Sequence, residues 1–175
     1  MGRKTDNLDD LQIRFASAGD VPLLLRFIRE LAAYEGLTDE VSATEALLRE
    51  WMFEKGRAEA LIGERGGEPV AFALFFYSFS TFLGRAGIYL EDLYVSPEAR
   101  GRGVGTKLLS FLAKLAVERG CGRLEWSCLD WNRDSVAFYL SLGAKAMDGW
   151  TVYRLAGDTL QRLAERAAGA AGEKG

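Results

Sequence analysis

A glycine-rich loop between an apolar strand and an amphipathic helix constrains the fold of this chain most. Residues 88–95, IYLEDLYV, are β-branched, aromatic or apolar at most positions, which is typical of a strand. A proline-marked turn follows, then Gly101, Gly103 and Gly105, and then leucines at helical spacing. Such a loop forms an anion site, because backbone N–H groups at the start of a helix can point at one phosphate.

Spacing separates three kinds of phosphate-binding loop. A P-loop requires G-x-x-x-x-G-K-[ST], but Thr106 precedes Lys107 here and no glycine lies five positions before Gly105, which excludes this reading. A dinucleotide fingerprint requires G-x-G-x-x-G, whereas the chain has G-x-G-x-G followed by Leu108. Glu125 lies at about the distance that such a fingerprint needs, so this alternative is weakened and stays open. The third reading is Arg100-x-x-Gly103-x-Gly105.

Length, composition and charge indicate which broad class of protein this chain belongs to. The length of 175 residues fits one domain, and 49% hydrophobic with 27% charged residues is typical of a soluble globular chain. The net charge of -3 argues against a general nucleic-acid binder and suits a cationic substrate. No apolar run is long enough to span a bilayer, and residues 1–10 lack a signal-peptide core, so we expect no membrane association and a cytoplasmic location.

The chain has two cysteines and no histidine, which limits the groups that could carry out catalysis. Cys121 and Cys128 have no metal-binding spacing, so we predict no metal site. The chain contains no histidine, and a cysteine nucleophile would need one as its partner. Base catalysis near neutral pH therefore has to use a carboxylate, a tyrosine or a chain of waters.

The order of elements predicts an α/β (α+β) fold. Strands are expected at 11–15, 60–62, 69–79, from 88 onward, 123–129 and 150–155, with a hairpin turn at Gly66-Gly67. Helices are expected after Asp20, after a capping box Ser42-x-x-Glu45, after the glycine loop and over 132–142. Together they predict a mixed, mostly antiparallel twisted sheet of six to seven strands flanked by helices. We expect a disordered start at 1–10, a single domain at 11–157, and a helix followed by a disordered tail at 158–175.

Two motifs carry a family resemblance. The Arg100-x-x-Gly103-x-Gly105 loop resembles the acetyl-CoA pyrophosphate loop of the GCN5-related N-acetyltransferases, the GNAT family. A second stretch, Asp130-Trp131-Asn132-x-x-Ser135-x-x-Phe138-Tyr139-x-x-x-Gly143-Ala144, resembles the other family signature, with an asparagine before a helix and a tyrosine within it. The resemblance covers nearly the whole chain and implies the GNAT fold, acetyl-CoA as cofactor and transfer of an acetyl group.

Three shorter segments point to one group within that family. Ala32-x-Tyr34-Glu35, Tyr89-Leu90-Glu91-Asp92 and Leu129-Asp130-Trp131-Asn132 look most like the diamine (spermidine/spermine) N-acetyltransferases and their thialysine-acetylating relatives. Phe82-Leu83-Gly84 departs from that group, whose members tend to have a tryptophan there. The departure leaves the identity of the amine open.

The resemblance implies the residues of the site. Substrate binding is expected from Tyr34, Glu35, Glu91, Asp92 and Trp131. Cofactor binding is expected from Leu93, Tyr94, Val95, Arg100, Gly101, Arg102, Gly103, Val104, Gly105, Thr106, Asn132, Ser135 and Tyr139. Backbone N–H groups near Leu93 and Val95 would also hold the thioester oxygen.

Two side chains are expected to move protons. An alkyl ammonium with a pKa of about 10.4 has to lose a proton before it can attack, and Glu91 is the candidate base, acting through ordered water. By resemblance, Tyr139 is the acid that returns a proton to the departing thiolate. Its phenol, with a pKa of about 10, is close enough to a thiol at about 8.5 to do so.

The sequence therefore predicts an acetyl-CoA-dependent N-acetyltransferase that acts on a primary amine of a small cationic substrate in a ternary complex. Alternatives are an acetyltransferase of the same fold for an aminoglycoside, amino acid or protein N-terminus, a non-catalytic CoA-binding module, or a nucleotide-dependent oxidoreductase. By analogy with the relatives, we also expect a homodimer.

Overall fold

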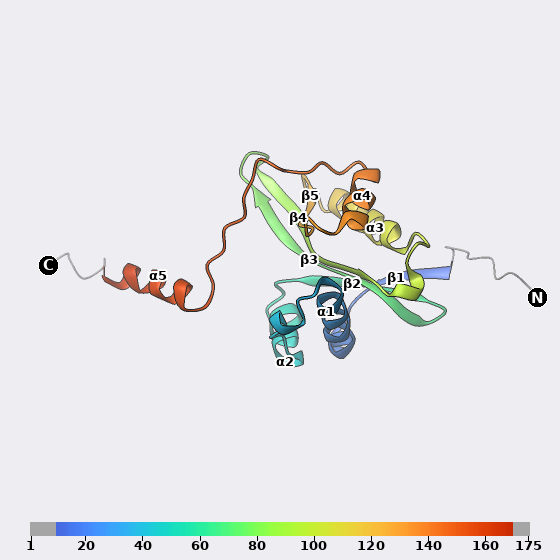
Figure 1. Cartoon of the computed structure of the whole chain (residues 1–175), viewed down its shortest axis with the longest axis horizontal. Helices are drawn as coiled ribbons and strands as arrows, with labels where there is room; N and C mark the ends of the chain where they lie inside the picture. Colours follow the sequence, from blue (N-terminus) through green and yellow to red (C-terminus); the bar gives the residue numbers. More distant parts are fainter. Residues whose placement is uncertain (1–9, 170–175) are drawn as a thin grey trace, which may run out of the picture. The chain divides into compact units, whose positions relative to one another are not determined.

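The computed structural model describes residues 10–169. The chain divides into two compact units, Met1–Ser127 and Cys128–Gly175. The first unit is a sheet with helices on both faces (Figure 1). The second contains two helices joined by an extended segment.

The sheet of the first unit has the strand order β1-β2-β3-β4-β5. Its strands are β1 Leu11–Phe15, β2 Glu59–Arg65, β3 Glu68–Ser80, β4 Arg85–Val95 and β5 Leu124–Trp126. β1 to β4 pair antiparallel, and β5 is parallel to β4. Gly66 and Gly67 both have positive φ, of 59° and 83°, as the two-residue turn between β2 and β3 requires. The prediction of a mixed, mostly antiparallel sheet is confirmed.

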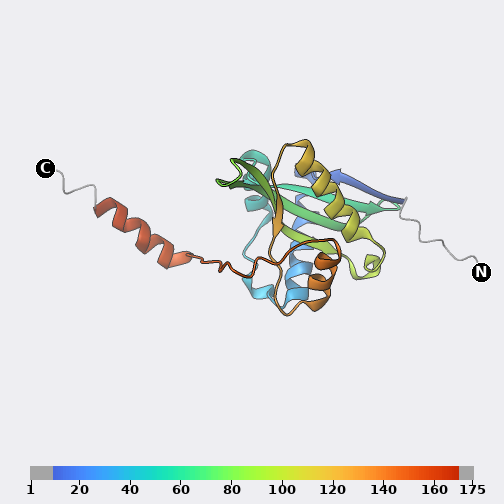
Figure 2. The same ribbon diagram turned by 90° about the horizontal axis from the view of Figure 1, so that it is seen from above.

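Two helical layers cover this sheet. α1 (Val21–Glu35) and α2 (Glu45–Leu48), which continues into the π-helical segment η4 (Arg49–Glu54), lie on one face, and α3 (Val104–Glu118) lies on the other (Figures 1 and 2). Short 3₁₀ turns complete the unit at η2 (Ala18–Asp20), η3 (Thr38–Glu40) and η5 (Pro97–Ala99). The apolar side of α1 faces the sheet, with Val21, Leu24, Leu25, Phe27 and Ala32 buried. Phe27 stacks on Phe72 of β3 at 5.4 Å between ring centres.

An irregularity in the β3–β4 pairing decides which way the site residues point. Leu74 pairs with Asp92 and the next residue, Phe75, pairs with Leu90, so Glu91 is an extra residue in β4, a β-bulge. Because Leu74 and Phe75 face opposite sides of the sheet, their partners Asp92 and Leu90 do so as well. Leu74 and Phe27 of α1 belong to the same hydrophobic core cluster, so Leu74 faces α1. The bulge therefore turns Asp92 to the α1 face.

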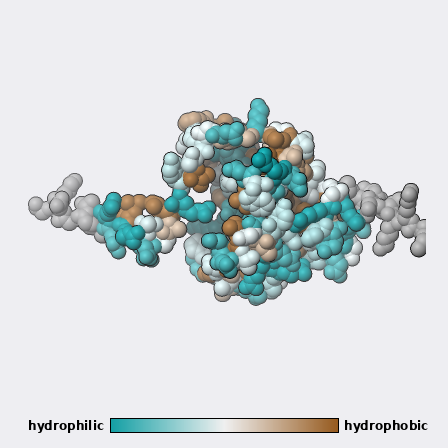
Figure 3. All heavy atoms as spheres, in the orientation of Figure 1, coloured by the Kyte–Doolittle hydropathy of each residue, from teal (hydrophilic) through white to brown (hydrophobic). Residues whose placement is uncertain are grey.

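The second unit contains α4 (Arg133–Ser141) and α5 (Gly157–Gly169). Asn132 caps α4, as its side-chain oxygen accepts a hydrogen bond from Ser135 N at 3.2 Å. α5, which begins at the predicted place, is amphipathic, with one apolar side visible in Figure 3. The predicted disordered ends lie mostly outside the described residues.

The structure corrects the expected number of strands. Within residues 10–169 the sheet has five strands, not six to seven, and residues 150–155 form no strand. A strand needs a partner for its backbone groups, and in the described part of the chain no strand pairs with this segment. Its large apolar side chains, Trp150, Val152, Tyr153 and Leu155, are 52–91% exposed. Alternating apolar residues alone therefore gave a wrong prediction here.

Two predicted helix caps also differ. Thr44, not Ser42, caps α2, and its hydroxyl oxygen accepts from Leu47 N at 3.2 Å. Asp20 does precede α1, but its carboxylate accepts from Ser17 N at 2.7 Å and binds Arg14. It closes the turn before the helix and does not cap the first turn of α1 itself.

Candidate active site

The glycine loop has the geometry of an anion cradle. Gly101 and Gly103 have φ of 69° and 77°, a left-handed backbone conformation that is strained for residues with a side chain. Gly103 is the N-cap of α3. The first hydrogen bond of this helix runs from Lys107 N to the Gly103 carbonyl at 3.0 Å. The N–H groups of Val104, Gly105 and Thr106 precede that bond, as expected for the first turn of a helix. This loop fits a diphosphate such as that of acetyl-CoA.

β4 leaves one edge open next to this loop. Its pairing with β5 ends at Leu90–Trp126, and within residues 10–169 no strand pairs with that side of residues 91–95. Ser96 N donates to the Val70 carbonyl of β3 at 2.8 Å. Backbone groups alternate in direction along a strand, so those of Leu93 and Val95 point away from β3, toward the open edge. An extended amide chain such as the pantetheine arm fits this edge, whereas the backbone of Tyr94 faces β3.

Three carboxylates form an acidic cluster at the bulge, Glu35, Glu91 and Asp92. Asp92 is half-buried, and burial, followed by the charges of Glu91 and Glu35, raises its pKa to about 6. Burial also raises the pKa of Glu35, the last residue of α1. Glu91 is exposed at the bulge itself. The charges of Glu91 and Glu35 both act on the pKa of Asp92, so the structure brings these three predicted residues near one another. A cation placed there would relieve their repulsion.

Arg100 lies between the loop and α1. Its Nε–H donates to the Val95 carbonyl at 2.8 Å, at the open edge of β4. Its guanidinium lies 4.6 Å from the ring centre of Tyr34 and 5.7 Å from that of Tyr94. The predicted substrate residue Tyr34 and the predicted cofactor residue Arg100 are therefore in direct contact.

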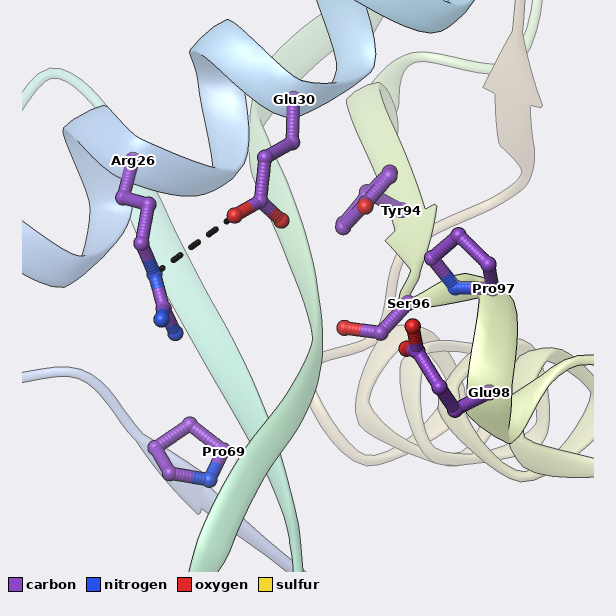
Figure 4. Close-up of a pocket in the computed structure, with 7 residues that line it drawn as sticks. All are labelled: Arg26, Glu30, Pro69, Tyr94, Ser96, Pro97 and Glu98. Carbon is purple, nitrogen blue, oxygen red and sulfur yellow. Dashed lines mark ion pairs between the residues drawn. The ribbon is translucent and has the colours of Figure 1, made fainter.

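A cavity of about 340 Å³ opens next to Tyr94 (Figure 4). Its lining residues are Arg26, Glu30, Pro69, Tyr94, Ser96, Pro97 and Glu98. Glu30 pairs with Arg26 at 3.8 Å, and burial together with a hydrogen bond to Glu30 raises the pKa of Tyr94. Of the predicted site residues only Tyr94 lines this cavity. The tyrosine is 5% exposed and belongs to the core beside Phe27.

The remaining predicted residues belong to the second unit. Asn132 is 7% exposed and holds the first turn of α4 through Ser135. Tyr139 lies within α4, with its ring 5.3 Å from that of Phe138. Trp131 is exposed just before the helix. The second motif thus has the predicted local structure, with an asparagine before a helix and a tyrosine within it.

Sequence reasoning missed two features of this site. The bulge at Glu91 depends on the register between β3 and β4, and the charged pair Glu-Asp inside an apolar strand was its only signal. Glu30 was missed although it is a half-buried acid on a helix with an otherwise apolar inner face. Within residues 10–169, no group of acidic residues or cysteines could hold a metal ion. No helix in this part of the chain is long and apolar enough to cross a membrane.

Most of the chain matches one known protein family. Residues 25–144 match the model of the "Acetyltransferase (GNAT) family". The chain is 40% identical to a thialysine N-epsilon-acetyltransferase of Bos taurus over 166 residues, which cover 88% of this chain and 97% of the relative. It is 33% identical to the human spermidine/spermine N(1)-acetyltransferase-like protein 1, over 93% of this chain and 25% of that longer protein.

A solved structure has the same fold. An integron cassette protein from the mobile metagenome of V. cholerae superposes with a TM-score of 0.76 at 27% identity, covering 89% of this chain and 98% of that one. The family match spans more than half of the chain, and the first relative matches along almost its whole length. The chain is therefore a member of the acetyltransferase (GNAT) family, an N-acetyltransferase whose cofactor is acetyl-CoA.

Proposed function

We propose that this enzyme acetylates a primary amine of a small aliphatic substrate that carries a second cation, such as a diamine, a polyamine or a thialysine- or lysine-like amino acid. The acidic cluster at the end of β4 is the observation that carries this proposal. Three carboxylates in one place, one of them with a pKa of about 6, favour a ligand with an ammonium group. The names of the relatives, which act on thialysine or on spermidine and spermine, support the same class.

Each part of the site has a role in this proposal. The first-turn N–H groups of α3 hold the diphosphate of the cofactor, and Leu93 and Val95 hold its amide arm along β4. Bound acetyl-CoA supplies an activated acetyl group as a thioester. Asp92 and Glu35 hold the remote cation, which leaves the reacting amine directed toward the open edge. Glu91, exposed at the bulge, accepts the proton of this amine through water.

The proton balance defines the chemistry. The substrate ammonium first loses one proton to Glu91 through water, which gives the neutral amine that attacks. As the new N–C bond forms and the C–S bond breaks, the nitrogen loses a second proton to water. The departing sulfur takes one proton, which the resemblance assigns to Tyr139. Direct attack in a ternary complex requires both substrates to be bound at once, so neither product should form before the second substrate binds.

We further propose that the protein is a homodimer located in the cytoplasm. The homodimer is proposed by analogy with the family group that the sequence resembles, and both points are open to simple measurement.

A panel of amines assayed with acetyl-CoA tests the proposed function. It should contain thialysine, lysine, ornithine, spermidine, an aminoglycoside and a peptide N-terminus, with free thiol and acetylated product both measured. We expect the highest kcat/KM among the aliphatic diamines and diamino acids. Preference for the aminoglycoside or the peptide would contradict the proposal. Acetyl-CoA should also raise the melting temperature, and NAD should leave it unchanged.

A further inference from the structure

Arg100 makes contacts that a simple phosphate ligand would not make. Its Nε–H donates a hydrogen bond to the Val95 carbonyl at 2.8 Å, and its guanidinium carbon lies 4.6 Å from the ring centre of Tyr34. Both partners are protein groups, one on β4 and one at the end of α1. Hydrogen bonding through one nitrogen while the plane stacks on a ring is a use for which arginine is suited and lysine is not.

The side on which Arg100 packs also matters. Tyr94 lies on the α1 face of the sheet, since its ring contacts Phe27 at 5.7 Å and it belongs to the same core cluster. The guanidinium lies 5.7 Å from the Tyr94 ring and therefore on this face. The helix α3, whose first turn forms the anion cradle, covers the opposite face (Figure 2).

We propose that Arg100 is a positioning residue that ties the amine-binding end of α1 to the start of the cofactor loop, rather than a ligand of the diphosphate. Through Tyr34 it fixes the chain next to Glu35, and through the Val95 carbonyl it fixes the open edge of β4. The proposal rests on the proposed function, because it takes α1 as the amine side and β4 as the cofactor side. It assigns to the Arg100 side chain a role that differs from the one that the family resemblance implied.

An acetyl donor without the diphosphate distinguishes a positioning role of Arg100 from a phosphate-binding role. S-Acetylpantetheine carries the same thioester as acetyl-CoA but lacks the diphosphate. If Arg100 positions Tyr34 and Val95, Arg100→Met should raise the KM of the amine roughly three- to tenfold with both donors alike. If Arg100 binds phosphate, the variant should be impaired with acetyl-CoA and normal with S-acetylpantetheine, and this result would overturn the proposal. Arg102→Met is the matched control, expected to be impaired with acetyl-CoA alone.

A second readout does not depend on activity. In the ligand-free protein, Arg100→Met, Tyr34→Leu and the double variant are unfolded in urea. The two changes should be non-additive by roughly two- to fivefold in the unfolding equilibrium constant, and Tyr34→Phe, which keeps the ring, should retain the coupling. Additive effects would refute the contact on which the proposal depends. If the wild-type enzyme acetylates no amine in the panel, the proposed function fails, and this cycle still decides the role of Arg100.

Discussion

Replacing Asp92 with asparagine removes one charge from the acidic cluster at nearly constant volume. In the folded protein the pKa of Asp92 is raised from 3.8 to about 6 by burial and by Glu91 and Glu35. The folded state therefore binds the proton of this carboxyl more tightly than the unfolded state. Its favourable contribution is fully present below the unfolded pKa and is lost as the pH rises through about 6. Ionised Asp92 should thus lower the free energy of unfolding of the wild-type protein at neutral and higher pH.

The magnitude follows from the size of the shift. About two pKa units correspond to about 3 kcal/mol once the carboxyl is ionised in both states. At about pH 4.5 the same calculation gives about 1 kcal/mol, because the unfolded state is already mostly ionised while the folded state is not. The advantage of Asp92→Asn should therefore grow by up to about 2 kcal/mol between about pH 4.5 and pH 8.

Urea unfolding of the ligand-free protein at these two pH values measures this difference. Asp39→Asn, which removes an exposed carboxylate by the same chemical change, is the control and should show little difference between the two pH values. The opposite effect is expected on function, because the variant that gains stability loses part of the cation site and should show a higher KM for diamines. If Asp92→Asn changes stability equally at both pH values, or leaves the amine KM unchanged, the account of the acidic cluster is wrong.

Three further predictions concern the cofactor loop, the acid and the assembly. Gly103→Val, at a φ of 77°, should weaken acetyl-CoA binding at least about tenfold in calorimetry while the far-UV circular dichroism stays close to wild type, and unchanged affinity would contradict the cradle. Tyr139→Phe should lower turnover roughly 10²- to 10⁴-fold with little change in acetyl-CoA affinity, whereas near-normal turnover would mean that water or substrate protonates the thiolate. Light scattering at micromolar concentration should give twice the mass of one chain, and the mass of a monomer would refute the homodimer.

The glycine loop and the helix that follows it could be predicted from sequence because all of their determinants are local. Gly101, Gly103 and the first turn of α3 are adjacent in the chain, so their spacing alone indicated both the loop and the helix. The same holds for Asn132 and the helix that it caps. Turns and helix caps that are specified by neighbouring residues depend little on the rest of the fold.

The direction of Asp92 could not be predicted, because it depends on how two strands are aligned. The extra residue at Glu91 reverses the faces of β4 between Leu90 and Asp92, and only the pairing with β3 reveals this. The contact between Arg100 and Tyr34 likewise joins residues far apart in the chain. The wrong strand at residues 150–155 has the same origin, since an alternating pattern does not show whether a partner strand exists.

A matched pair of substrates tests the central claim most directly. 1,5-Diaminopentane and pentylamine present the same primary amine on the same carbon chain, but only the diamine carries the remote cation that Asp92 and Glu35 are proposed to hold. With acetyl-CoA as donor, the wild-type enzyme should prefer the diamine by at least about tenfold in kcat/KM, and Asp92→Asn should reduce this preference. Equal kcat/KM for the two amines, or no acetylated product from either, would contradict the claim that this enzyme acetylates small amines through recognition of a second positive charge.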